Sequence, residues 1–145
     1  MTDLRRFLDE TLDLVRHRAR KEDKSLTLDV AEPPPAAAIM QTQLQQSLIN
    51  LLENALDATP PHAKITVGAA RIDHGVAVWV ENQGEPIPAE IREVIFEPFF
   101  TTKPPGRGAG MGLAIAANFI RAQGGHLRYE DASGGGARFV IELPG

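Results

Sequence analysis

Three short stretches of the chain carry residue types that could together bind a nucleotide and a divalent cation. Residues 50–58 (NLLENALDA) combine two asparagines with a glutamate and an aspartate. Residues 82–103 (NQGEPIPAEIREVIFEPFFTTK) join a polar turn to aromatic and basic residues, and residues 106–113 (GRGAGMGL) are rich in glycine. Amide and carboxylate oxygens suit Mg²⁺, whereas glycine backbones at a helix entry suit phosphate. Each stretch alone is a weak signal, and the prediction of a nucleotide and cation site rests on all three together.

The first stretch is predicted to be an amphipathic helix with one polar side. At about 100° per residue, Asn50, Asn54 and Asp57 fall within about 60° of one another, and Glu53 lies about 60° from Asn50. An asparagine oxygen can bind Mg²⁺ without adding negative charge beside a triphosphate. The alternative is an ordinary solvated helix face, although asparagine is a poor residue for a helix interior.

Two glycine-containing turns extend the prediction. Gly108, Gly110 and Gly112 precede an apolar helix, where free N–H groups could contact phosphate. This stretch fits neither a Walker loop nor GxGxxG, and alone it is more typical of a flexible turn. Asn82 ends an apolar strand beside Gly84, so its side chain could contact a purine edge or merely form an Asx turn.

The segment between these turns is predicted to be a mobile lid. Residues 99–110 lack apolar periodicity and are rich in proline and glycine, and Lys103 could reach a phosphate. Phe96 is expected to be a core residue. The four histidines have no metal-ligand spacing. His17 lies in a basic helical stretch and is interpreted as solvent-exposed rather than as a phosphoacceptor.

Apolar periodicity then predicts the elements that position these residues. The predicted helices span residues 3–20, 40–58, 88–96 (short) and 111–123, and the predicted strands span 26–30, 65–70, 76–80, 127–130 and 137–143. Hairpin turns are expected at residues 73–75 and 133–136. The fold class is α+β: a two-layer α/β sandwich whose mixed, mostly antiparallel sheet is packed on one face by three helices. Residues 1–145 are expected to be a single domain.

Composition excludes several classes of protein. The chain has 145 residues, a net charge of −4 and no cysteine, so it offers neither a basic nucleic-acid footprint nor a disulfide or thiolate metal site. It has no apolar run near the roughly 18 residues of a membrane span. We therefore expect no nucleic-acid partner, no direct membrane contact and a cytoplasmic location.

With these stretches in this order, the chain resembles the catalytic ATP-binding domain of bacterial two-component sensor histidine kinases. These kinases share an ATPase superfamily with gyrase, mismatch-repair proteins and heat-shock chaperones. Residues 50–58 match the asparagine box, 82–88 the first glycine box, 96–103 the phenylalanine box and 108–113 the second glycine box. The string FEPFFTTK is the most specific and points to the kinases.

The resemblance implies ATP and Mg²⁺ as cofactors. It assigns the metal to Asn54 and Asn50, a general-base or orienting role to Glu53, and phosphate binding to Lys103. The catalytic candidates are therefore Glu53, Asn50 and Lys103. The implied nucleotide-binding residues are Asn50, Asn54, Asp57, Asn82, Gly84, Ile87, Phe96, Thr101, Thr102, Lys103, Gly108, Gly110, Met111, Gly112 and Leu113.

The chain departs from the family pattern in four places. Asn82 stands where the family usually has aspartate, Pro86 where it has a second glycine, and Ala137 where it often has threonine. The phosphoacceptor motif, a histidine followed by an acidic residue, is missing because His17 is followed by Arg18. The resemblance therefore implies a catalytic domain excised from a longer parent kinase, which could be membrane-anchored. Its partners would be the parent's dimerisation and phosphoacceptor-histidine domain and, indirectly, a response regulator, and the isolated domain would be monomeric.

The leading hypothesis is an ATP-dependent protein histidine kinase domain. It would transfer the γ-phosphoryl group to a histidine on a separate dimerisation helix and would not autophosphorylate alone. One alternative is a serine kinase of the anti-sigma-factor type, against which the FFTTK string argues. The other is a non-catalytic nucleotide-binding module, which the departures at Asn82 and Ala137 leave open.

Overall fold

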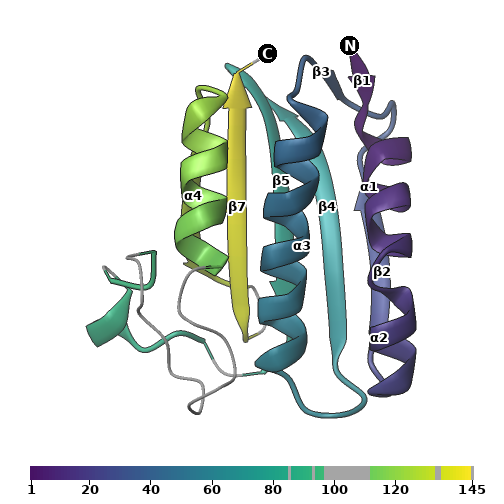
Figure 1. Cartoon of the computed structure of the whole chain (residues 1–145), viewed down its shortest axis with the longest axis vertical. Coiled ribbons are helices and arrows are strands. Elements are labelled where there is room, and N and C mark those ends of the chain that lie inside the picture. Colours follow the sequence, from purple (N-terminus) through teal and green to yellow (C-terminus); the bar gives the residue numbers. More distant parts are fainter. Residues whose placement is uncertain (85, 93, 97–111, 133–134, 145) are drawn as a thin grey trace.

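A computed structural model (Figure 1) describes residues 1–84, 86–92, 94–96, 112–132 and 135–144. Its main sheet has five strands in the order β2-β4-β5-β7-β6. β2 (Ser25–Val30) runs parallel to β4 (Lys64–Ile72), and all other neighbours are antiparallel: β5 (Gly75–Asn82), β7 (Ala137–Pro144) and β6 (His126–Asp131). The prediction of a mixed, mostly antiparallel sheet is confirmed.

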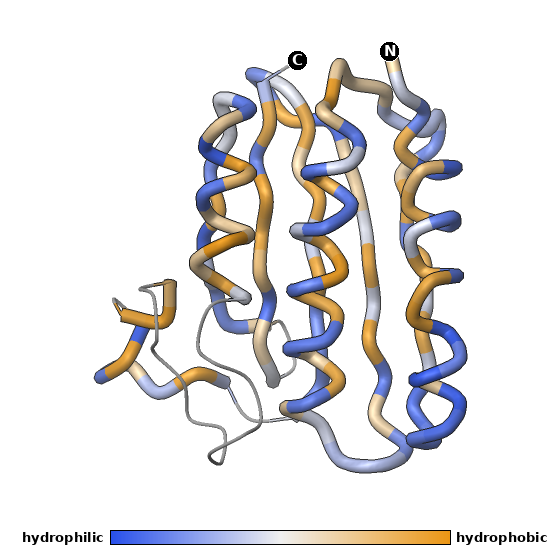
Figure 2. The backbone as a smooth tube through the Cα atoms, viewed as in Figure 1, coloured by the Kyte–Doolittle hydropathy of each residue, from blue (hydrophilic) through white to orange (hydrophobic). Residues whose placement is uncertain are grey.

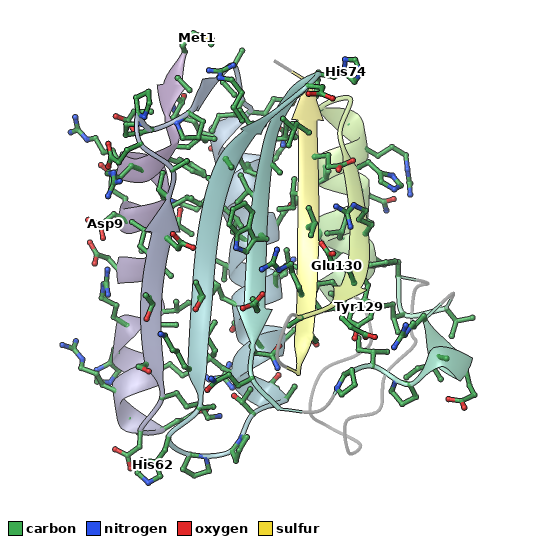
Figure 3. The ribbon with its side chains drawn as sticks, turned by 180° about the vertical axis from the view of Figure 1, so that it is seen from behind. Met1, Asp9, His62, His74, Tyr129 and Glu130 are labelled. Carbon is green, nitrogen blue, oxygen red and sulfur yellow. The ribbon has the colours of Figure 1, made fainter. Side chains whose placement is uncertain are left out.

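The helices cover one face of this sheet. α1 (Leu4–Asp13), α2 (Arg16–Lys21), α3 (Gln41–Asp57) and α4 (Gly112–Ala122) lie in front of the strands in Figure 1, and Figure 3 shows the uncovered face from behind. The two-layer α+β architecture is therefore as predicted.

In the described part of the chain, a hydrophobic core fills the space between the two layers. Alternate residues of β5 and β7, such as Val78 and Ile141, are buried against α3 and α4, whose leucines, isoleucine and alanines face the sheet. Figure 2 shows hydrophobic and hydrophilic residues alternating around α1 and α3. Because strand side chains alternate between faces, the last residue of β5, Asn82, lies on the same face as Val78 and Val80.

The predicted helix over residues 3–20 is wrong as a single element. It breaks at Leu14 and Val15, where the N–H groups of both residues bond the carbonyls three positions back, at 3.1 and 3.0 Å. Such tight bonds are typical of a final helical turn, and a new helix, α2, begins at Arg16. Two short strands, β1 (Thr2–Asp3) and β3 (Ala36–Ala37), pair with each other and were not predicted.

The predicted short helix over residues 88–96 is also mostly wrong. Within the described residues 88–92 and 94–96, the helical structure is limited to one 3₁₀ turn, η1 (Ala89–Ile91). The carbonyl of Ile87, immediately before Pro88, accepts a hydrogen bond from the Arg92 side chain at 2.9 Å instead of from a helical N–H. The predicted lid, residues 99–110, lies outside the described residues.

The chain termini and the candidate site residues lie toward opposite ends of the molecule. Both termini lie at one end, together with the β4–β5 turn, and the C-terminal end of α3 and the close of β5 lie toward the other (Figure 1). Met1 and His74 mark the first end in Figure 3, and His62 marks the second. Among the described residues, no helix is both long and apolar enough to cross a membrane.

Candidate functional site

The polar side of α3 faces the first turn of α4. Leu48, Leu51 and Leu52 on the other side of α3 are buried in the core, whereas Asn50 and Asn54 are half-buried. A Cβ atom built on Gly112 would lie 4.0 Å from the Cβ of Asn50, so the start of α4 lies against this asparagine. The structure thus brings together two of the predicted stretches.

One polar atom of Asn50 is buried without a partner. Its Oδ1 accepts a hydrogen bond from Gln46 Nε2 at 3.3 Å, but its Nδ2 is buried with no hydrogen-bond partner among the described residues. A buried unpaired polar group costs about 1–3 kcal/mol. A ligand that accepted a hydrogen bond from this atom would remove that cost. Asn54 makes no side-chain hydrogen bond within the described part of the chain.

Asn82 lies deep at the end of β5. It is 5% exposed and stands between Ile65 of β4 and Ala137 of β7 in the sheet register. Its Nδ2 donates to the carbonyl of Gln83 at 3.2 Å. This bond orients the amide so that Oδ1, which has no hydrogen-bond partner in the described residues, is the group available to a donor.

Two glycines shape the turns around Asn82. Gly84 has a φ of +129°, which disfavours any residue with a Cβ. Gly136, with a φ of +107°, packs so closely that a Cβ there would lie 2.0 Å from the carbonyl oxygen of Asn82. Gly136, immediately before β7, therefore packs closely against the end of β5.

The segment that follows Gly84 is anchored by side chains of β6. Tyr129 Oη accepts a hydrogen bond from Ile87 N at 2.8 Å and donates to Asp131 Oδ1 at 2.8 Å. Arg92 lies over the Tyr129 ring, 5.0 Å from its centroid, and pairs with Asp131 at 2.8 Å. Burial and the hydrogen bond to Asp131 raise the pKa of Tyr129, so the phenol stays protonated at neutral pH. Figure 3 shows Tyr129 beside the segment that carries η1.

An aromatic group continues this anchor into the core. Phe139 of β7 makes edge-to-face contacts with Tyr129 and Phe96, at centroid separations of 5.6 and 6.0 Å. Phe96 packs against the core, as predicted. Sequence reasoning missed Tyr129, although a lone tyrosine in a strand of the last hairpin was a signal that could have been followed.

An arginine of α2 lies beside the acidic residues of α3. Arg18 forms an ion pair with Asp57, lies 4.0 Å from Glu53 and bonds Glu22 at 2.7 Å. Burial disfavours its charge, but the hydrogen bonds to Glu22 and Asp57 outweigh that effect and raise the pKa of Arg18. Asp57, a predicted nucleotide ligand, is thus engaged by another part of the protein, and Glu53 is half-exposed near the same guanidinium. Sequence reasoning missed this role of Arg18.

The remaining predicted site residues fall into two groups. Gly112 and Leu113 form the start of α4, where Gly112 is exposed and Leu113 packs against the core. The others lie outside the described residues: Thr101, Thr102, Lys103, Gly108, Gly110 and Met111. The described part of the candidate site therefore has one end at Asn82 and a second end at Asn50 and Gly112.

This arrangement can be compared with known proteins. Residues 40–145, which run from the start of α3 to the end of the chain, match the family of histidine kinase-, DNA gyrase B- and HSP90-like ATPases. The chain belongs to this family. Within it, the similarity is to sensor histidine kinases: the ZraS kinase of Escherichia coli O157:H7 is 34% identical over 142 residues, which are 98% of this chain and 31% of ZraS.

Solved structures place the chain more narrowly among the ATPases of this family. The catalytic domain of the histidine kinase ThkA is 33% identical, with a TM-score of 0.88 over 99% of this chain and 93% of that domain. Full-length ShkA, solved with AMPPNP, is 30% identical, with a TM-score of 0.87 over 99% of this chain and 30% of ShkA. ThkA was also solved with the response regulator TrrA; that ThkA chain is 31% identical, with a TM-score of 0.84 over 99% of this chain and 40% of ThkA.

These matches identify the chain as an ATP-binding catalytic domain of the sensor histidine kinase type. The chain spans less than a third of the length of the curated kinases that it matches, between 23% and 31% for the first three.

Proposed function

We propose that the chain binds Mg²⁺-ATP and transfers the γ-phosphoryl group to a histidine on a separate dimerisation helix, within a pathway that leads to a response regulator. The observation that carries this proposal is the buried amide of Asn82 at the end of β5, with its oxygen available to a donor. The co-structures of ShkA with AMPPNP and of ThkA with TrrA support it by similarity.

Asn82 would recognise the adenine base. An amide oxygen accepts a hydrogen bond from an exocyclic amino group, and the bond from Nδ2 to Gln83 keeps the mismatched NH₂ away from the base. Gly84 and Ile87 would form the neighbouring wall of the pocket, since the chain continues through them from Asn82. The amide would thus replace the family's usual aspartate.

Asn50 and Asn54 would hold the phosphate end with its metal. The residues present fit such a group, because the buried Nδ2 of Asn50 lacks a partner beside the first turn of α4. This NH₂ can donate to a phosphate oxygen, or the turned amide can offer its oxygen to a cation. Bound Mg²⁺ would neutralise phosphate charge and help to orient the transferred group. The N–H groups that begin α4 would add positive potential.

Glu53 and Lys103 would complete the catalytic residues. Glu53, half-exposed on α3, would accept a proton from or orient the attacking histidine, and Arg18 would hold its carboxylate near that position. Lys103 would bind phosphate, together with Thr101, Thr102, Gly108, Gly110 and Met111. Such an arrangement works mainly by positioning and charge neutralisation, which suits phosphoryl transfer.

Two measurements test the proposal. Calorimetry should detect ATP binding that weakens when Mg²⁺ is chelated. Radiolabelled ATP should then phosphorylate a separately produced dimerisation domain of the parent kinase at an acid-labile, base-stable position, whereas the chain alone, including His17, should remain unlabelled.

The other outcomes separate the alternatives. Acid-stable labelling of a protein serine would indicate a serine kinase, and nucleotide binding without transfer to any histidine would indicate a non-catalytic module. Stable acid-labile labelling of the chain by itself would contradict the proposed division between catalytic and phosphoacceptor domains.

A further inference from the structure

Ile87 has both of its backbone polar groups satisfied by side chains that come from elsewhere. Its N–H donates to Tyr129, 42 residues away along the chain, and its carbonyl accepts from Arg92 Nε. Ile87 lies in neither a helix nor a strand, so its backbone is held by these two bonds while its side chain packs against the core. Along the sequence, Ile87 comes shortly after Asn82 and Gly84, which form the base side of the proposed site.

We propose that Tyr129 is a positioning residue for nucleotide binding, which sets the base-side wall of the pocket by holding the backbone of Ile87. This inference rests on the proposed function. Tyr129 would not touch the nucleotide; it acts through the segment that it holds. Its ring is itself fixed from behind by Phe139, its register partner on β7.

The phenol hydroxyl matters more than the ion pair next to it. Arg92 and Asp131 are 37% and 55% exposed in their side chains, and exposed ion pairs contribute little. Tyr129, in contrast, is half-buried and its oxygen both accepts from Ile87 and donates to Asp131. Asp131 therefore serves mainly to orient the hydroxyl so that its lone pairs face the Ile87 N–H.

The decisive variant is Tyr129→Phe. It removes only the hydroxyl and leaves the ring against Phe139 and under Arg92, so we expect the protein to fold with an unchanged melting temperature within about 3 °C. Hydrogen exchange at the Ile87 amide should accelerate in the nucleotide-free protein. Affinities for ATP and for ADP should fall by the same factor, about fivefold, because both nucleotides share the base side of the pocket.

A matched pair of arginines provides the control. Arg92 and Arg138 each lie over an aromatic ring, at 5.0 Å from Tyr129 and 5.3 Å from Trp79, and each pairs with a carboxylate. Arg138, however, lies on the sheet face that the helices leave uncovered. Arg92→Gln should weaken ATP and ADP equally, since it releases the Ile87 carbonyl, and Arg138→Gln should leave both affinities within twofold.

The outcomes are distinct. If the unaltered chain binds no nucleotide, the proposed function fails, and this inference fails with it. If the unaltered chain binds ATP and Tyr129→Phe binds it equally well, only the positioning role is overturned, whether or not Ile87 exchanges faster. A loss for ATP much larger than for ADP would also overturn it, because the hydroxyl would then act at the phosphate end. If both arginine variants melted at a lower temperature and lost nucleotide affinity equally, the cause would be a general effect on stability instead.

Discussion

Replacing Asn82 with leucine should separate nucleotide binding from folding. The side chain is 5% exposed and makes one hydrogen bond, at 3.2 Å, to the carbonyl of the next residue. Leucine is similar in size and gains from burial at this depth, so the free energy of unfolding should change by no more than about 1 kcal/mol. In the complex, however, the adenine amino group would be buried without an acceptor. That costs about 1–3 kcal/mol, or roughly 5- to 140-fold in affinity.

Calorimetric titration with Mg²⁺-ATP, together with urea unfolding, measures both quantities. Asn82→Asp should retain or tighten binding, because a carboxylate offers only acceptors to the base. Thr11→Val is a matched control, since it also replaces a buried polar side chain, 1% exposed, but lies on α1. ATP binding by Asn82→Leu within twofold of the unaltered protein would refute the placement of adenine at the end of β5.

Three further results are expected. Asn54→Ala should abolish the Mg²⁺-dependent part of ATP affinity with little effect on urea unfolding, because the side chain is half-buried and outside the core. If the magnesium dependence were unchanged, the polar side of α3 would be an ordinary solvated helix face. Gly136→Ala should lower the free energy of unfolding by about 2 kcal/mol more than Gly135→Ala. Both glycines have a positive φ, but only at Gly136 would the added Cβ lie 2.0 Å from a backbone oxygen. An equal loss of stability in the two variants would contradict this close approach. The hydrogen bonds from Arg18 and Lys24 lower the pKa of Glu22 below its ordinary value of 4.5, so this carboxylate stabilises the fold above that pH and the stabilisation is lost as pH falls through the lowered pKa. Urea midpoints between pH 6 and 3 should accordingly fall less steeply in Glu22→Gln, and identical profiles would exclude the contribution.

The elements that were predicted correctly are those whose signal is local. The apolar positions of α3 and the alternation in β4 and β5 are determined by helix and strand periodicity, so their bounds were predicted within two residues. The burial of Asn82 was not predicted, although it fits the same alternation once β5 extends to residue 82. The break at Leu14 could not be predicted in this way, because helical spacing continues across it through Leu12, Val15 and Ala19.

Contacts between distant residues explain the other errors. Ile87, just before the 3₁₀ turn, donates its N–H to Tyr129, and Asp57 accepts a hydrogen bond from Arg18, which is 39 residues away. A single sequence does not state which side chains will meet across such separations. It therefore predicted the residue types of the candidate site better than the residues that support them.

The placement of the two termini has a practical consequence for measurement. Both lie at one end of the molecule, whereas His62 marks the other end, toward which β5 and α3 run (Figures 1 and 3). A biotin tag at either terminus would hold the protein on a sensor surface with the candidate site directed away from it, toward the flowing solution. A fluorophore at His62 would report on events at that far end without interference from the immobilised one.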